Sequence, residues 1–171
     1  MTDKLKEKIK KIKVLAMDVD GVLTNGKIVL DNKGNELKYF DVQDGYGIAV
    51  IRRAGIKTAI ISARSAGAVT SRAADLNIDK VFQDAYPKTV AYSKLLKELK
   101  VSSDEVCFVG DDLPDIVLLE KVGFAVAVKN AASEVKRSAD YVTKKQGGDG
   151  AIREVVELIL KTQGKWKNIL N

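Results

Sequence analysis

The stretch Val14-Leu15-Ala16-Met17-Asp18-Val19-Asp20-Gly21-Val22-Leu23-Thr24 joins an apolar run to two aspartates that are separated by one residue. The apolar run has the length of a buried strand. Residues i and i+2 of a strand point to the same face, so Asp18 and Asp20 are expected side by side at its carboxyl end. Open α/β sheets bind their ligands at that end. Two adjacent carboxylates repel unless a cation lies between them or one is protonated, although a strand that ends in an Asp-Gly turn explains this stretch equally well.

The rest of the chain alternates between strand-like and helix-like segments. Apolar, β-branched runs predict strands at 57–62, 80–82, 105–110, 124–128 and 140–143. Amphipathic or Ala-rich segments predict helices at 3–12, 44–53, 65–75, 87–100, 113–121, 131–137 and 151–161. Alternation with continuously apolar strands indicates a doubly wound, Rossmann-like α/β fold, with a mostly parallel sheet and helices on both faces.

We expect residues 1–171 to form a single domain with two appendages. Residues 26–41 contain two β-prone runs around an Asn/Gly turn and predict a small β-hairpin inserted after the first strand. Residues 162–171 predict a C-terminal tail, whose Trp166, Ile169 and Leu170 can pack on the body. The remaining segments are used up by predicted helices and strands, so we expect no cap domain.

Charge and composition exclude several classes of function. The net charge is +6, but residues 1–13 carry +4 and residues 161–171 carry +3, which leaves −1 on residues 14–160. This distribution disfavours nucleic-acid binding, because no basic stripe crosses the body. The chain has no histidine, which excludes a Ser/His or Cys/His nucleophile. No apolar run approaches a membrane span or a secretory signal, so we expect a cytoplasmic protein without membrane contact.

Further polar side chains end later strands or begin helices. They are Ser62, Arg64, Lys88, Asp111, Asp112 and Asp115. In a doubly wound sheet these positions converge at one edge with the first two aspartates. Carboxylates without histidine or thiolate ligands favour Mg²⁺, which in such sites commonly meets phosphate.

These groups can perform phosphoryl transfer. One aspartate can attack phosphorus, and the other can protonate the leaving alkoxide and later activate water. Ser62 and Lys88 can hold the phosphoryl oxygens. Each residue taken singly has a structural explanation. Ser62 can cap a helix, and Lys88 can be a solvated helix lysine. Asp111 and Asp112 can cap the helix that begins near Pro114 and interact favourably with its dipole. Their joint occurrence in this order favours the catalytic interpretation.

The set Asp18-Val-Asp20-Gly-Val-Leu-Thr, Ser62, Lys88 and Gly-Asp111-Asp-Leu-Pro-Asp115 resembles the four motifs of the haloacid dehalogenase-like phosphohydrolases. The resemblance implies that Asp18 is the nucleophile and Asp20 the general acid/base. It implies a metal held by the Asp18 carboxylate, the Asp20 backbone carbonyl and Asp111. Asp115 would support this metal site and orient Lys88.

Further segments are similar to the family of 3-deoxy-D-manno-octulosonate 8-phosphate phosphatases. They are the hairpin and residues 41–48, 62–64, 147–154 and 163–166. This resemblance implies Mg²⁺-dependent hydrolysis of a sugar-acid phosphate in lipopolysaccharide precursor synthesis. It also implies a homotetramer in which hairpins meet at the centre and neighbours cover each site. Ala63 departs from the family, which often has glycine there.

Four residues are candidates for binding phosphate or substrate. Arg64 suits a carboxylate or phosphate, because guanidinium pairs bidentately with either. Gly21 directly follows the paired aspartates. Asp44 is a candidate on the substrate side, although it is equally suited to cap a helix. By the family resemblance, Lys165 in the tail would reach a neighbouring subunit's site.

Other functions stay open at this point. The substrate can be a nine-carbon sugar-acid phosphate, or the enzyme can be a small phosphatase of broad range. A receiver domain, which traps a phosphoryl group as a switch, also uses acidic residues, a Ser/Thr and a lysine, but in a different order along the chain. The hairpin carries more apolar residues than a solvated hairpin needs, which favours an interface, although it can also fold onto its own domain.

Overall fold

The computed structural model describes residues 1–169 and the side chains through residue 167. Its centre is a six-stranded sheet in the order β5-β4-β1-β6-β7-β8, and all of its pairings are parallel. The strands are β1 (Val14–Met17), β4 (Lys57–Ile61), β5 (Lys80–Phe82), β6 (Val106–Gly110), β7 (Phe124–Ala127) and β8 (Tyr141–Val142). The predicted doubly wound fold is confirmed.

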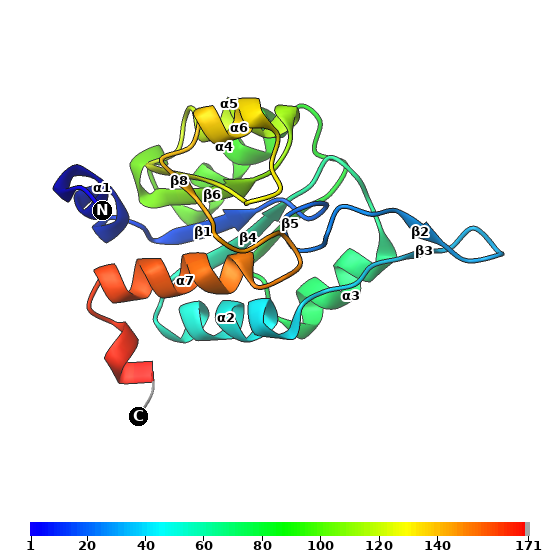
Figure 1. The fold of residues 1–171 in the computed structure, drawn as a ribbon, viewed down its shortest axis with the longest axis horizontal. Coiled ribbons are helices and arrows are strands. Elements are labelled where there is room, and N and C mark those ends of the chain that lie inside the picture. Colours follow the sequence, from blue (N-terminus) through cyan, green and yellow to red (C-terminus); the bar gives the residue numbers. More distant parts are fainter. Residues whose placement is uncertain (170–171) are drawn as a thin grey trace.

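Helices cover both faces of the sheet, as Figure 1 shows. One face carries α2 (Val42–Arg53), α3 (Gly67–Asp75) and α7 (Ala151–Thr162). The other carries α4 (Lys88–Leu99), α5 (Ile116–Leu119) and α6 (Ser133–Arg137). The N-terminal helix α1 (Asp3–Lys10) packs against α7 and β7. Short 3-10 helices are η1 (Ser103–Glu105), η2 (Leu113–Asp115) and η3 (Trp166–Ile169).

The core forms because the central strands are apolar throughout and are covered on both sides. Every residue of β1, β6 and β7 is buried. Strands of this kind read as continuous apolar runs rather than as alternating patterns. Helix α7 adds a stripe at helical spacing, with Ile152, Val155, Val156 and Ile159 fully buried.

The chain reverses direction across the sheet between β1 and β6. From β1 the chain proceeds through α2 to β4 and then to β5 on one side. From β5 it returns through α4 to β6, which pairs with the other side of β1. Such a reversal leaves a crevice beyond the carboxyl ends of the two strands, where ligands bind.

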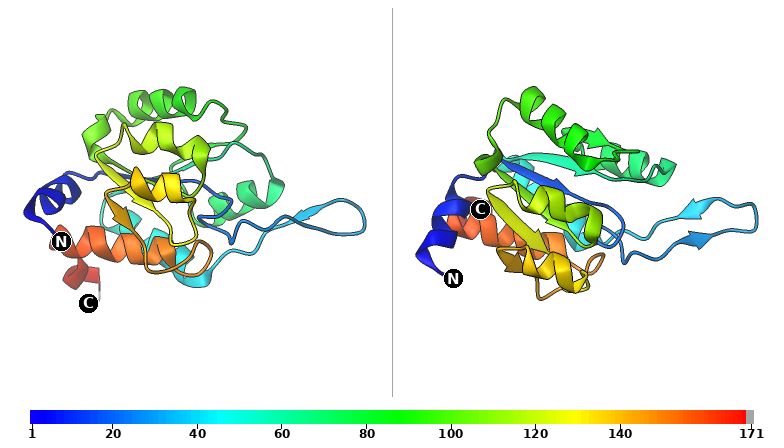
Figure 2. Two further views of the ribbon diagram at one scale, coloured as in Figure 1. Left: turned by 45° about the horizontal axis from the view of Figure 1, so that its top comes forward. Right: turned by 90° about the horizontal axis from the view of Figure 1, so that it is seen from above.

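The predicted hairpin forms a separate two-stranded ribbon. Strands β2 (Val29–Leu30) and β3 (Glu36–Leu37) pair antiparallel, with Val29 opposite Leu37. Figure 2 shows the ribbon extending from the body, at the end opposite the two chain termini. Leu30 and Tyr39 are 61% and 65% exposed, so its apolar side chains face outward. No helix within residues 1–169 combines the length and apolar character needed to cross a membrane.

Some element boundaries differ from those expected. Helix α2 begins at Val42 rather than at residue 44, because the Asp41 carboxylate caps it by accepting the backbone N–H of Asp44 at 2.9 Å. The helix expected over 113–121 is η2 followed by the short α5. Pro114 stands near the start of η2, where its missing N–H is tolerated.

Candidate active site

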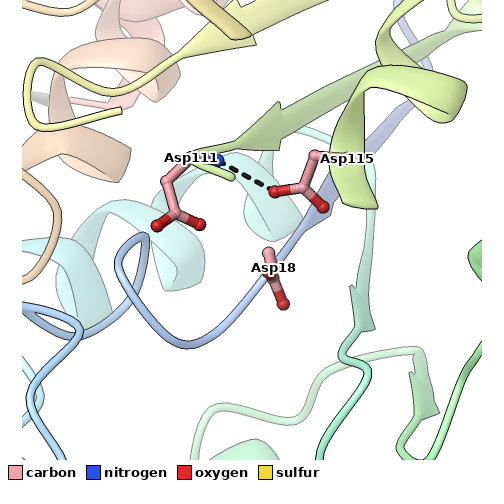
Figure 3. A group of neighbouring side chains, drawn as sticks. All are labelled: Asp18, Asp111 and Asp115. Carbon is pink, nitrogen blue, oxygen red and sulfur yellow. Dashed lines mark hydrogen bonds between the residues drawn. The ribbon is translucent and has the colours of Figure 1, made fainter. Parts of the chain in front are cut away.

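Three carboxylates converge where β1 and β6 end. Asp18 directly follows β1, and its backbone N–H donates to the Val109 carbonyl of β6 at 3.0 Å. Asp111 directly follows β6, and Asp115 closes the next turn. Carboxylate oxygens of Asp18, Asp111 and Asp115 lie within 4.8 Å of one another. Figure 3 shows the three side chains. The crevice at the chain reversal is therefore strongly acidic.

Lys88 supplies a buried positive charge to this cluster. It begins α4 and is only 2% exposed. Its ammonium lies 2.8 Å from an oxygen of Asp18 and 2.6 Å from an oxygen of Asp115. Burial opposes the charge, but Asp18 and Asp115 outweigh it and hold the Lys88 pKa above its ordinary value. Lys88 is thus a fixed cation beside the Asp18 carboxylate.

Asp115 is fully engaged and acts as a support. One of its oxygens binds Lys88, and the other accepts the backbone N–H groups of Asp111 at 2.9 Å and Asp112 at 3.3 Å. Gly110 makes this approach feasible, because a Cβ there would lie 2.6 Å from the Cβ of Asp115. Asp115 therefore orients Lys88 and the loop that carries Asp111.

Asp111 and Asp18 both have raised pKa values. Burial, followed by the charges of Asp115 and Asp18, raises the pKa of Asp111 to about 8. Burial and the charge of Asp115 raise the pKa of Asp18 to about 6, although Lys88 opposes this. The Oδ1 atom of Asp111 is buried without a hydrogen-bond partner. An orphaned carboxylate oxygen within an all-oxygen cluster fits a hard divalent cation such as Mg²⁺.

The backbone of Gly21 lies close to the Asp111 carboxylate. Gly21 has φ +85°, and a Cβ there would lie 2.0 Å from Asp111 Oδ2. The Asn130 side chain donates to the Gly21 carbonyl at 3.0 Å and accepts the Gly147 N–H at 2.6 Å. Asn130 thus joins the loops that follow β1 and β7 to the loop before α7. The sequence analysis missed it, since a lone asparagine in a loop carries no distinguishing signal.

The structure brings most of the predicted residues into one cleft. Its lining includes Asp18, Asp20, Ser62, Ala63, Arg64, Lys88, Asp111, Asp112 and Asp115. Ser62 follows β4, is 2% exposed, and its hydroxyl accepts the backbone N–H of Arg64 at 3.3 Å. The cleft therefore contains a hydroxyl and a guanidinium together with the acidic cluster.

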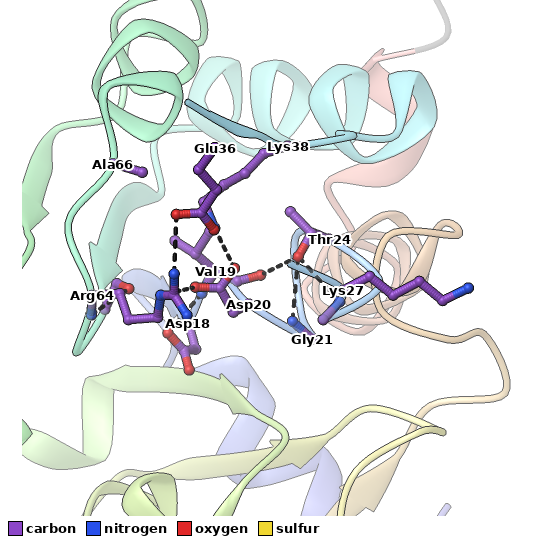
Figure 4. Close-up of polar contacts among 12 residues, drawn as sticks. Asp18, Val19, Asp20, Gly21, Thr24, Lys27, Glu36, Lys38, Arg64 and Ala66 are labelled. Carbon is purple, nitrogen blue, oxygen red and sulfur yellow. Dashed lines mark hydrogen bonds and ion pairs between the residues drawn. The ribbon is translucent and has the colours of Figure 1, made fainter. Parts of the chain in front are cut away.

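Asp20 lies apart from the three clustered carboxylates. It forms ion pairs with Lys38 of the hairpin and with Arg64, as Figure 4 shows. The sequence analysis assigned no role to Lys38 or to its neighbour Glu36. A usable signal existed, because two charged residues at i and i+2 share one face of a strand whose other face is apolar.

Two candidates lie outside the cleft. Asp44 is 1% exposed, and its carboxylate accepts the Arg153 N–H at the start of α7 at 2.8 Å. Lys165 follows α7, and this C-terminal segment lies at the end of the molecule opposite the hairpin, as Figures 1 and 2 show. The Trp166 ring lies 5.4 Å from the Arg153 guanidinium. The expected packing of Ile169 and Leu170 falls outside the side chains that the structure describes.

Fold and site together define a class of phosphoryl-transfer hydrolase. A sheet with paired aspartates after its first strand, and with a lysine-supported acidic turn after a neighbouring strand, holds the groups for nucleophilic attack on phosphate. The sequence profile of the haloacid dehalogenase-like hydrolases matches residues 80–155, which include Lys88 and Asp111.

Within this class, the chain belongs to the family of 3-deoxy-D-manno-octulosonate 8-phosphate phosphatases. It is 46% identical to the Escherichia coli K12 enzyme of that name over 158 residues, which are 92% of this chain and 84% of that one.

Solved structures agree with this relationship. A Moraxella catarrhalis 3-deoxy-D-manno-octulosonate 8-phosphate phosphatase, in complex with a magnesium ion, a phosphate ion and KDO, superposes with a TM-score of 0.96. It is 39% identical, over 99% of this chain and 98% of that one. The Yersinia pestis enzyme superposes with a TM-score of 0.95 at 41% identity, over 98% and 90% of the two chains.

Proposed function

We propose that this protein is a Mg²⁺-dependent phosphatase that converts 3-deoxy-D-manno-octulosonate 8-phosphate to the free sugar acid and phosphate. One observation carries the proposal: Asp18 and Asp111 meet beside the buried Lys88 at the chain reversal of the sheet. The assignment of the substrate rests on the family relationship. The product would serve lipopolysaccharide precursor synthesis, and we propose a cytoplasmic location.

Asp18 is the proposed nucleophile. A carboxylate oxygen of Asp18 attacks phosphorus, and the bond from phosphorus to the sugar oxygen breaks. The carboxylic acid of Asp20 gives its proton to the leaving alkoxide, and its carboxylate then takes a proton from water. That water attacks the phosphorus of the aspartyl-phosphate and releases phosphate and free Asp18. The sequence consumes one water for each phosphate released.

The metal would be held by the carboxylates of Asp18 and Asp111 and by the backbone carbonyl of Asp20. When bound, Mg²⁺ neutralises the mutual repulsion of these carboxylates and the negative charge of the phosphoryl group. Lys88 and Ser62 hold phosphoryl oxygens from the protein side. Lys88 keeps its positive charge because the Asp115 carboxylate is paired with its ammonium. Gly21 admits the phosphoryl group close to the backbone.

Arg64 is the proposed partner of the sugar acid's carboxylate or of the phosphate periphery. It lines the cleft and has a half-exposed side chain. Ala63 adds one methyl group beside it. The buried position of Asp44 supports a structural contribution to the site through α7 rather than direct contact with substrate.

We propose a homotetramer that covers each site with neighbouring subunits. The outward apolar side chains of the hairpin support an interface at this element. Lys165 would then act at a neighbouring subunit's site, since it lies far from its own. Sedimentation at micromolar concentration checks the assembly, and a monomer alone would contradict it.

A phosphate-release screen tests the activity. The purified protein with Mg²⁺ is assayed on 3-deoxy-D-manno-octulosonate 8-phosphate, a nine-carbon sugar-acid phosphate and simple sugar phosphates. We expect kcat/KM to be highest for the first by roughly tenfold or more. Equal rates on all substrates would indicate a broad-range phosphatase, and a trapped phosphoryl group without turnover would indicate a receiver-like switch.

A further inference from the structure

The hairpin carries two charged side chains back to the mouth of the cleft. Glu36 and Lys38 lie on the inward face of the strand β3 segment, while Leu37 and Tyr39 are exposed. Lys38 is the more enclosed of the two, and its side chain is 2% exposed. A lysine so deeply buried near the base of a solvated hairpin requires charged partners.

Four side chains form a closed ring of alternating charge, visible in Figure 4. The Lys38 ammonium binds an Asp20 oxygen and lies 2.9 Å from a Glu36 oxygen. The other oxygen of Glu36 lies 3.0 Å from the Arg64 guanidinium, and Arg64 Nε lies 3.8 Å from the second oxygen of Asp20. Three separate segments, the loop after β1, the hairpin and the loop after β4, therefore meet at Asp20.

The two aspartates of the first motif separate because strand β1 ends at Met17 and the chain bends at residues 19–20. The same-face spacing expected of a strand therefore does not extend to Asp18 and Asp20. In the structure, Asp18 joins Asp111 and Asp115, whereas Asp20 is not one of the carboxylates within 4.8 Å of each other. The direct contacts of the Asp20 carboxylate are instead with Lys38 and Arg64. Lys38 is the closer and the more buried of these two cations.

We propose that Lys38 is a positioning residue, which holds the Asp20 carboxyl group on the leaving-group side of the cleft and away from the cluster of Asp18 and Asp111. This inference rests on the proposed function, in which Asp20 transfers the proton. Lys38 itself touches neither substrate nor metal in this assignment. Glu36 fixes Lys38 from behind and ties Arg64 into the same ring.

The surroundings of Lys38 favour a fixed contact. Two carboxylates, those of Asp20 and Glu36, bind its ammonium, and a lysine is ordinarily protonated throughout the working pH range. A permanent cation gives Asp20 one preferred direction. The paired and enclosed geometry makes this contact stronger than an exposed ion pair.

The chemistry of the leaving group offers a selective test. A sugar phosphate releases a strongly basic alkoxide that needs a proton from Asp20. The compound p-nitrophenyl phosphate releases a stable phenolate that needs none. If Lys38 positions the proton donor, its loss must slow the first substrate far more than the second.

The experiment compares Lys38→Ala, Lys38→Arg and wild type on 3-deoxy-D-manno-octulosonate 8-phosphate, or another alkyl phosphate that wild type hydrolyses, and on p-nitrophenyl phosphate. The comparison uses kcat/KM, which reports the steps through departure of the leaving group and not the later hydrolysis of the aspartyl-phosphate that both substrates share. For Lys38→Ala we expect kcat/KM on the alkyl phosphate to fall about tenfold or more, part of the roughly 10²–10⁴-fold that acid–base catalysis supplies. The kcat/KM for p-nitrophenyl phosphate should change less than about threefold, and Lys38→Arg should restore part of the loss.

Lys27→Ala is the matched control, since Figure 4 shows the ammonium of this hairpin lysine pointing away from Asp20. Circular dichroism and sedimentation verify that each variant folds and assembles as wild type does. Lys38→Met keeps the apolar stem and replaces the alanine variant if that variant fails to fold.

The two hypotheses fail in different ways. Wild type that hydrolyses no alkyl phosphate would overturn the proposed function. If wild type hydrolyses an alkyl phosphate but Lys38→Ala lowers kcat/KM for both substrates equally, or for neither, the positioning role is overturned. The proposed function then stands.

Discussion

The Asp44 carboxylate on α2 accepts the backbone N–H of Arg153 at 2.8 Å and so caps the first turn of α7. The residue at the N-cap position of α7 is Gly150, which has no side chain to perform this task. A residue more than 100 positions earlier in the chain supplies the missing acceptor. Removal of this acceptor in Asp44→Ala should lower the free energy of unfolding by about 1–2 kcal/mol, measured by urea denaturation.

The same residue gives a pH-dependent prediction. Burial raises the pKa of Asp44 to about 6, above its ordinary value near 4. The folded state therefore prefers the protonated form of Asp44, and the contribution of this residue to wild-type stability should fall as pH rises from about 4 to about 6. Asp44→Asn keeps an acceptor without the charge, so its stability relative to wild type should increase across that window and then level off. Melting temperatures from pH 4 to 8 check this, and a constant difference would contradict it.

Asp18→Asn should abolish turnover while preserving the fold. The amide is nearly isosteric but cannot attack phosphorus, so kcat should fall by roughly 10⁴-fold or more. The change also removes a buried charge, so the melting temperature should not decrease. Asp3→Asn, at the exposed start of α1, is the control and should retain wild-type kinetics. Substantial activity in Asp18→Asn would exclude Asp18 as the nucleophile.

Removal of the divalent ion should lower stability as well as activity. The raised pKa values of Asp18 and Asp111 mean that the metal-free fold is destabilised at neutral pH, because the unfolded chain ionises both carboxyl groups more easily than the folded chain does. Adding Mg²⁺ after EDTA treatment should raise the melting temperature by about 2 °C or more, since 1 kcal/mol corresponds to about 2–4 °C at this size.

Asp111→Asn separates these two effects. Without metal it should melt at or above the wild-type temperature at neutral pH, because an amide does not lose a proton on unfolding as the Asp111 carboxyl does. With Mg²⁺ it should gain little, because a ligand is missing. If Mg²⁺ raised the melting temperature of this variant as much as that of wild type, Asp111 would not be a metal ligand.

Lys88→Met should be the most destabilising of these single changes. It leaves the carboxylates of Asp18 and Asp115 buried without their shared cation, and breaking such a pair costs about 3–5 kcal/mol. The loss should be smaller at pH 5 than at pH 8, since Asp18, with its raised pKa, is largely protonated at the lower pH. Chemical denaturation at both pH values measures the difference, and equal losses would contradict this account.

Deletion of residues 163–171 tests the C-terminal tail. The segment carries Lys165, and Trp166 packs on the body beside Arg153. If the tail serves a neighbouring site, deletion should alter kcat or product release under conditions where the oligomer persists. Unchanged kinetics in a folded, assembled variant would rule out that role.

Local patterns predicted the sheet well, because burial on both faces leaves an unmistakable apolar run. Val14–Met17 and Val106–Gly110 needed no tertiary information to be identified. Helix α2 is a contrast. Asp41 and Asp44 both suit an N-cap, and the sequence analysis began the helix at Asp44. Asp41 caps α2, whereas Asp44 caps a different helix, and only the packing of α2 against α7 decides between them.

The residue types of the site were predictable from the sequence, but the contacts between its side chains were not. The order of Asp18, Ser62, Lys88 and Asp111 along an alternating chain indicated one edge of the sheet, and the cleft contains all four. The i, i+2 spacing of Glu36 and Lys38 indicated a polar face on the hairpin, but not the partner of Lys38, because Asp20 lies 18 residues away and meets it only through the path of the hairpin.

The ribbon formed by β2 and β3 has no core of its own, yet it brings Lys38 to Asp20, the residue proposed to transfer the proton. Two short strands are the first part of such a molecule to open on warming. Heat should therefore inactivate the enzyme while the α/β body still gives a native spectrum. A neighbouring copy that clamps the ribbon would confer heat resistance on turnover without contacting a single reacting atom.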